Sequence, residues 1–171
     1  WCWTVEGLKR LSKHHETGAT LPRDLLDKML AAKNVNVGLN MARQIYLSTL
    51  DLEIHGTNPP TTAEGLQALV DRLRPEISLI ENPEGANMLR SFGHLMNQYS
   101  AAYYGYLWAE VLSADMFAQC FEKDPFDAKA GKRYRDLVLA PGGVGKILDH
   151  LTTFLGRPPS QEAFLKSRGI A

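Results

Sequence analysis

The chain has 171 residues and carries 19 basic and 19 acidic side chains, so its formal net charge at pH 7 is zero. This length suits one domain, and an apolar content of 44% supplies a buried core and excludes a disordered chain. Zero net charge argues against a nucleic-acid partner, which requires an excess of clustered basic residues. No apolar run reaches the roughly 20 residues of a membrane helix, so we expect no membrane partner.

The two cysteines and the first residues bear on what kind of chain this is. Cys2 and Cys120 have no metal-binding or redox spacing, and we expect two buried thiols rather than a disulfide. The chain opens on Trp1-Cys2-Trp3 without a starting methionine. So apolar a beginning predicts a piece of a longer protein.

Two helices are predicted before residue 35. The first has Trp3, Leu8 and Leu11 on one face, and we expect it to stop at Gly18. The second follows Pro22, a residue that the first turn of a helix tolerates. Its inward side chains are expected to be Leu25, Leu26, Met29 and Leu30.

Two longer helices and a loop are predicted next. One helix is expected from 36 to 55, with Met41, Ile45 and Leu52 inward. Thr61 or Thr62 can cap the other, which Pro75 kinks or ends. Its buried side chains are expected to be Leu66, Leu69, Val70 and Leu73. Residues 82–98 keep no period, which predicts a loop, and a loop of that length is more often functional than idle.

The remaining segments also have helical patterns. A helix expected from Ser100 to Phe121 is apolar on nearly every side, which is typical of a buried helix. Asp127 can cap the next one, which 141–143 closes. Residues 146–155 are predicted to form a short helix that ends at Gly156, and Ser160 can cap a last helix that ends at Gly169. With strand signals nearly absent, the predicted fold class is all-α: an irregular multi-helix array forming a single helical unit over 1–171.

A stripe of polar side chains on the apolar helix is the strongest candidate for a site. Its members recur at spacings of three and four, which places them on one helix face: Tyr99, Tyr103, Tyr106, Glu110 and Ser113. A single tyrosine of this kind is usually a core residue with a satisfied hydroxyl, but three in register after Phe92-Gly93-His94 favour a binding surface. Gly93 and Gly105 permit close approach of a ligand. A tyrosine hydroxyl can stabilise an oxyanion, and His94 can donate beside it.

The other ionisable residues favour structural roles. Glu110 and Asp115 need partners if they are buried, and we expect Arg43, Arg133 or Arg135 to supply them. None of the five histidines belongs to a recognised zinc-peptidase motif, and no H-E-x-x-H occurs. The pair at 14–15 is interpreted as a solvated helix end rather than as two metal ligands.

Phe92-Gly93-His94-Leu95, Tyr99 and the run from Tyr103 to Val111 resemble the C-terminal part of the thimet oligopeptidase and neurolysin family, which are zinc endopeptidases that cut short peptides. The resemblance continues over essentially the whole chain: 8–14, 43–44, 115–117, 134–136, 141–143, 154–157 and 164–165. Within the family, the pattern is most similar to the cytosolic fungal member. The resemblance implies the C-terminal portion of a larger helical zincin-type oligopeptidase with a deep channel.

The resemblance also implies roles. Tyr99 or Tyr106 would donate to the oxyanion, His94 would assist or contact the substrate, and Tyr103 with the two glycines would shape a flexible loop. Asn97-Gln98 departs from the small residues frequent in the family and predicts a stiffer loop.

The implied zinc ion has its ligands outside this chain, which alone is therefore expected to be inactive. The implied partners are short peptides and the N-terminal part of the same protein. The implied location is the cytoplasm, with the mitochondrial intermembrane space as the alternative. The rival hypothesis is a non-catalytic helical peptide-binding or scaffold module.

Overall fold

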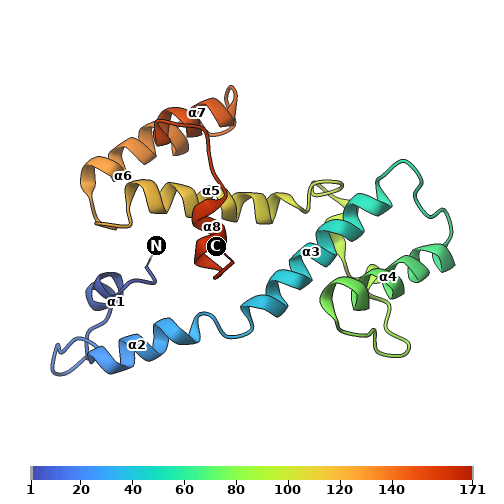
Figure 1. Ribbon diagram of the computed structural model, residues 1–171, viewed down its shortest axis with the longest axis horizontal. Coiled ribbons are helices and arrows are strands. Elements are labelled where there is room, and N and C mark those ends of the chain that lie inside the picture. The colour runs from blue at the N-terminus through green and yellow to red at the C-terminus, as the bar shows by residue number, and fades with distance from the viewer. Residues whose placement is uncertain (1, 171) are drawn as a thin grey trace. The chain divides into compact units, whose positions relative to one another are not determined.

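The computed structural model describes residues 2–170, which form helices and turns without a strand (Figure 1). The predicted all-α class is therefore confirmed. Contacts group the chain into two compact units: one contains the residues up to Val35 and those from Glu110 onward, and the other contains Asn36–Ala109. Each unit has its own apolar core, and the single unit expected over 1–171 stays a prediction.

Two short helices begin the first unit, α1 (Val5–Leu11) and α2 (Arg23–Ala32). The prediction that the first helix stops at Gly18 is wrong, because Ser12 adopts extended backbone and its hydroxyl donates to the carbonyl of Leu8 at 2.6 Å. The predicted inward stripe of α2 is also partly wrong. Leu26 is fully buried, whereas Leu25, one residue earlier and about 100° around the helix, is exposed.

The rest of the first unit contains the end of α5 (Gly105–Cys120), α6 (Ala128–Tyr134), the π-helix η3 (Arg135–Leu139), α7 (Ile147–Leu155) and α8 (Glu162–Ser167). Asp127 caps α6 as predicted, and Gly156 ends α7 in the left-handed conformation with φ 75°. The helical segment after Asp127 ends at Leu139, just before 141–143, and α8 has Gln161 rather than Ser160 in its N-cap position and ends two residues before Gly169. The core consists of Met116, Phe121, Ala130, Leu151, Phe154 and Leu155.

The second unit is built on α3 (Val37–Ile54) and α4 (Ala63–Ser78), which pack against each other (Figure 1). Thr62 caps α4 as predicted, but Pro75 does not end it. Ile45 and Leu52 are exposed, so their predicted inward position is wrong: α4 covers the neighbouring face of α3 instead. The core consists of Tyr46, Leu47, Leu50, Leu69, Val70, Leu73 and Tyr103.

The loop predicted at 82–98 contains two single turns, η1 (Met88–Arg90) and η2 (Gly93–Met96). Two predictions about the helix that follows are wrong. It begins at Gly105 rather than Ser100, because Ala101 adopts φ 57°, which an α-helix does not accept. It is also not buried on every side. Trp108 is 57% exposed, and within α5, all of which the structure describes, only Asp115 and Met116 are buried.

Two further expectations concern membrane crossing and the cysteines. Among residues 2–170, no helix combines the length and the apolar character needed to cross a membrane. Both cysteines are free thiols. Cys2 is exposed rather than buried, and Cys120 is half-buried, where desolvation raises the pKa of its thiol.

Candidate active site

The backbone of the loop before α5 is held by short-range hydrogen bonds. The Asn97 side-chain amide donates to the carbonyl of Gly93 at 2.8 Å, which closes the η2 turn. The Ser100 hydroxyl lies 2.8 Å from the carbonyls of both Leu95 and Asn97, and the Leu95 side chain is buried. These contacts fix the segment on which the predicted site residues stand.

Four aromatic rings from this segment and from the first turn of α5 form a cluster, here called the tyrosine cluster: His94, Tyr99, Tyr103 and Tyr106. The His94 ring centroid lies 5.4 Å from those of Tyr99 and Tyr103 and 6.1 Å from that of Tyr106. Tyr99 and Tyr106 stack at 5.2 Å, and Tyr103 meets Tyr106 edge-on at 5.0 Å. Ring contacts therefore connect all four predicted aromatic residues into one cluster.

The members of the tyrosine cluster differ in burial. Tyr103 is only 6% exposed and joins the core of its unit, whereas Tyr99 and Tyr106 are 42% and 39% exposed. A side-chain hydrogen bond with Tyr99 raises the pKa of Tyr106 to about 12. The cluster thus combines one buried tyrosine with two exposed ones, and the hydroxyl of Tyr106 stays protonated at neutral pH.

The predicted arrangement on one helix stripe is wrong, although the tyrosines do come together. Tyr99 and Tyr103 precede α5, and only Tyr106 belongs to its first turn. Glu110 and Ser113 belong to the other unit, where they line a cavity of about 560 Å³. The spacing predicted that the three tyrosines lie side by side on a helix. In the structure the turn around Ala101 brings them together without a helix.

The two glycines assigned to substrate binding have open surroundings. A Cβ atom at Gly105 would meet nothing within 4 Å, and one at Gly93 would meet only the Asn97 side-chain nitrogen at 4.0 Å. Neither residue has a positive φ angle. The fold itself does not require glycine at either position, so their role toward a ligand stays a prediction.

The prediction of which arginines neutralise the two carboxylates of α5 is wrong. Asp115 is buried and forms a bidentate ion pair with Arg157, at 2.6 and 2.9 Å. Glu110 pairs with Arg168 at 2.5 Å. Both arginines lie more than 40 residues further along the chain, a separation that no local pattern reveals.

The site residue that sequence reasoning missed is Asp51, on α3. Its side chain is fully buried and accepts hydrogen bonds from the backbone of the turn that carries the tyrosines. One signal could have identified it: Asp51 lies four residues after Leu47, on the same face of α3 as this core leucine. A carboxylate at a core position needs specific partners.

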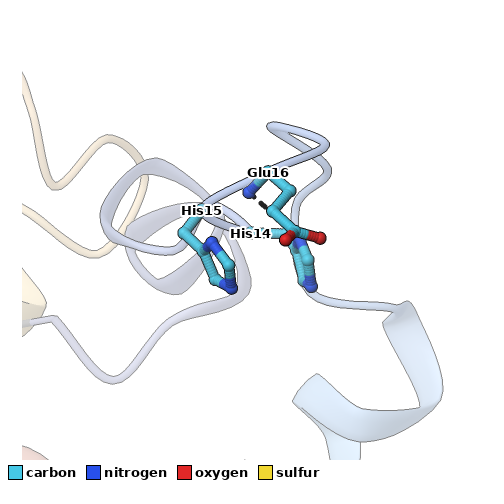
Figure 2. A group of neighbouring side chains, drawn as sticks. All are labelled: His14, His15 and Glu16. Atoms are coloured by element: carbon cyan, nitrogen blue, oxygen red, sulfur yellow. Dashed lines mark hydrogen bonds between the residues drawn. The ribbon is translucent and has the colours of Figure 1, made fainter.

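One group of potential metal ligands occurs among the described residues: His14, His15 and Glu16, whose ligand atoms lie within 4.8 Å of one another (Figure 2). The group stands in an exposed turn after α1. His14 Nδ1 accepts the N–H groups of Glu16 and Thr17, both at 3.3 Å. Binding of a metal through Nε2 would place a proton on Nδ1, facing those donors. These residues therefore do not fit the ligand set of a catalytic zinc ion.

Comparison with known proteins decides which family this fold and cluster belong to. The sequence pattern that defines peptidase family M3 matches residues 1–170. The chain belongs to peptidase family M3. The resemblance stated from the tyrosine-rich run is therefore confirmed.

Individual relatives agree with membership of family M3. Saccharolysin from Saccharomyces cerevisiae is 44% identical over 179 residues, covering 99% of this chain and 24% of the relative. Thimet-like oligopeptidase from Dictyostelium discoideum is 38% identical and oligopeptidase A from Escherichia coli 35%, each covering 99% of this chain and 25% of the relative. The chain thus spans about a quarter of the length of these relatives.

Proposed function

We propose that the intact protein is a zinc-dependent metalloendopeptidase that cuts short peptides, and that this chain supplies one wall of its substrate channel. Membership of family M3 and the names of the relatives, several of them oligopeptidases, support peptide cleavage. The zinc ligands would come from the N-terminal part of the same protein, since the histidines of this chain do not fit them. This chain alone would then be inactive.

The observation that carries the proposal is the exposed pair Tyr99 and Tyr106 beside His94. Attack on a peptide carbonyl places negative charge on its oxygen, and a neutral hydroxyl held nearby stabilises that charge. Because the pKa of Tyr106 is about 12, its hydroxyl keeps the proton that such a donor needs. His94 would assist or contact the substrate.

The remaining predicted residues would shape the peptide site around these donors. The buried ring of Tyr103 supports Tyr106 from beneath, which favours a fixed position of the hydroxyl. Open space at Gly93 and Gly105 is compatible with close approach of a peptide backbone. These contacts support a substrate loop between η2 and α5.

We also propose a cytoplasmic location, with the mitochondrial intermembrane space as the alternative. Arabidopsis thaliana relatives at 36–37% identity include one named a probable cytosolic oligopeptidase A and one named organellar. The family therefore contains proteins named for both kinds of compartment. Cell fractionation of the intact protein distinguishes the two locations.

The donor role is tested by Tyr106→Phe in the intact protein. The change removes one hydroxyl and keeps the ring stacking, so we expect kcat for a short internally quenched peptide to fall by about 10²- to 10³-fold with little change in KM. Tyr104→Phe is the matched control, since Tyr104 is a neighbouring exposed tyrosine, and we expect it to retain wild-type kcat.

Unchanged kcat in both Tyr106→Phe and Tyr99→Phe would contradict the donor role. If the intact wild-type protein binds peptides without cutting them even when supplied with zinc, the rival hypothesis of a non-catalytic peptide-binding or scaffold module replaces the proposed function.

A further inference from the structure

The carboxylate of Asp51 is buried, and three N–H groups from three other residues surround it. Its Oδ1 atom accepts the backbone N–H of Ala101 at 3.0 Å and lies 3.0 Å from Nδ1 of His55. Its Oδ2 atom accepts the N–H of Tyr103 at 2.9 Å. His55 Nδ1 also lies 2.9 Å from the main-chain carbonyl of Asp51, and because both neighbours are acceptors, this nitrogen carries the proton.

These hydrogen bonds hold a backbone conformation that the sequence alone disfavours. Ala101 adopts φ 57°, in the left-handed region that costs a non-glycine residue roughly 1–2 kcal/mol. The N–H of this same residue points at the carboxylate. A charge-assisted hydrogen bond to a buried carboxylate offsets a cost of that size. The carboxylate therefore selects the left-handed turn over a continuous helix from Ser100.

The conformation of this turn decides where the tyrosine hydroxyls lie. The Tyr99 carbonyl accepts the N–H of Ala102 at 2.9 Å, and the Tyr103 carbonyl accepts that of Tyr106 at 3.2 Å. The turn held by the carboxylate thus connects Tyr99, at its start, to Tyr106, in the first turn of α5. A shift of its backbone moves both rings of the exposed pair relative to each other.

We propose that Asp51 is a positioning residue that acts through the 101–103 turn to hold the hydroxyls of Tyr99 and Tyr106 in place, with His55 fixing the orientation of its carboxylate. Because the inference assigns those hydroxyls work on a substrate, it rests on the proposed function. Asp51 itself touches no reacting atom, since it is buried beneath the turn.

The test begins with Asp51→Asn in the intact protein. An amide keeps the size of the side chain but turns one acceptor into a donor, so at least one of the three hydrogen bonds is replaced by two opposed N–H groups. Misplacing a catalytic group by about 1 Å can cost about 100-fold in rate. We expect kcat to fall by about 10- to 100-fold with KM changed less than about threefold.

Asp115→Asn is the matched control. Asp115 is also a buried carboxylate that accepts a backbone N–H and side-chain N–H groups, here from Arg157, but its partners lie in the other unit. The change therefore alters a buried, hydrogen-bonded carboxylate of the same kind without touching the turn. We expect Asp115→Asn to keep kcat within about twofold of wild type well below its unfolding temperature. If both Asn variants lower kcat equally, the effect is general destabilisation and the inference is overturned.

A double-mutant cycle separates positioning from a merely structural role. If Asp51 acts through the hydroxyl of Tyr106, then Tyr106→Phe should lower kcat much less in the Asp51→Asn background than in wild type. Fully additive losses would overturn the inference. Hydrogen exchange of peptide 99–106, followed by mass spectrometry, should be faster in Asp51→Asn and unchanged in Asp115→Asn. Unchanged exchange in both would also overturn it.

His55→Ala keeps the test decisive if Asp51→Asn fails to fold. This change removes one donor from the partly exposed edge of the group and leaves both backbone hydrogen bonds. We expect about a three- to tenfold loss of kcat, again smaller in the Tyr106→Phe background. Unchanged kcat in both His55→Ala and Asp51→Asn, with a loss in Tyr106→Phe, overturns the role of Asp51 but leaves the proposed function. Unchanged kcat in the tyrosine variants contradicts the proposed function, while the exchange measurement still tests the turn.

Discussion

At the scale of single residues, two buried carboxylates organise the two units in the same way. Asp51 receives backbone N–H groups of the tyrosine turn, and Asp115 receives the N–H of Ser160 at 2.7 Å together with both guanidinium nitrogens of Arg157. Each carboxylate therefore joins a helix to a segment about 40 to 50 residues away along the chain. In both cases hydrogen bonds to a buried acidic side chain hold in place a segment without regular secondary structure.

The ion pair of Asp115 should make the folding stability depend on pH in the acidic range. The Arg157 guanidinium and then the Ser160 N–H hold the pKa of Asp115 below its usual range. Since the pKa is lower in the folded state, the stabilisation is complete above the unfolded value of about 3.9 and is lost as the pH falls through the folded value. We expect Asp115→Asn to lower the free energy of unfolding of the intact protein by about 3 kcal/mol at pH 7, measured by urea titration.

The difference between wild type and Asp115→Asn should shrink once the pH falls below about 4. Asp136→Asn provides a comparison, because Asp136 also has a lowered pKa from Lys132 and Arg135 but is a surface residue. A difference between wild type and Asp115→Asn that is constant from pH 7 to pH 3 would show that the ion pair does not carry this stabilisation.

At the scale of elements, a side-chain hydrogen bond spans the η2 turn. Asn97 directly follows this turn, and its side-chain amide donates to the Gly93 carbonyl. That the loop is stiffer than in other family members stays a prediction. Within this chain, a side-chain hydrogen bond across the turn opposes opening of the segment.

We expect Asn97→Ala to loosen this turn. A single hydrogen bond of this kind contributes about 1 kcal/mol, which corresponds to about a fivefold faster amide exchange in peptide 93–97. Hydrogen exchange of the intact protein measures it. Gln98→Ala is the matched control because Gln98 is the exposed neighbour of Asn97. Equal exchange rates in both variants would contradict the proposal that the Asn97 side chain stabilises the turn.

Elements whose boundaries depend on neighbouring residues could be predicted from the sequence. The caps Thr62 and Asp127 and the terminator Gly156 act within one helical turn, and all three are where their residue types indicate. The start of α5 could not be predicted in this way. The donor groups that fix it meet Asp51, 50 residues upstream, and this tertiary contact overrides the helical preference of the sequence around Ala101.

The candidate site, for the same reason, could be predicted only in part: contacts between residues close in sequence were predictable, and distant ones were not. The aromatic residues come together because they are close in sequence, so their spacing was informative even though the helix assumed for them was wrong. The partners of the acidic residues were missed, because Arg157 and Arg168 approach α5 from segments that pack only in the folded chain.

At the scale of the whole molecule, much apolar surface is exposed. The large exposed side chains include Trp3, Leu39, Leu79, Trp108 and Val144. Exposed apolar side chains favour association, because contact with another surface removes them from water. Since the chain spans about a quarter of the length of its relatives, we propose that the rest of the protein covers part of this surface.

We therefore expect the isolated 171-residue chain to self-associate. Light scattering should give an average mass above that of the monomer and rising with concentration. Trp108→Gln should reduce the association, because it removes the largest exposed side chain of α5, whereas Lys28→Gln on exposed α2 surface should not. A mass equal to that of the monomer at all concentrations would contradict the expectation.

The high pKa of Tyr106 has a consequence for how activity would vary in alkali. A hydroxyl that keeps its proton up to about pH 12 contributes no falling limb to a rate profile measured between pH 6 and 10. Any decline of kcat on the alkaline side would then report a different group. Replacing Tyr99 by Phe removes the hydrogen bond that raises this pKa, and an alkaline decline that appears only in this variant would identify the ionisation as that of Tyr106.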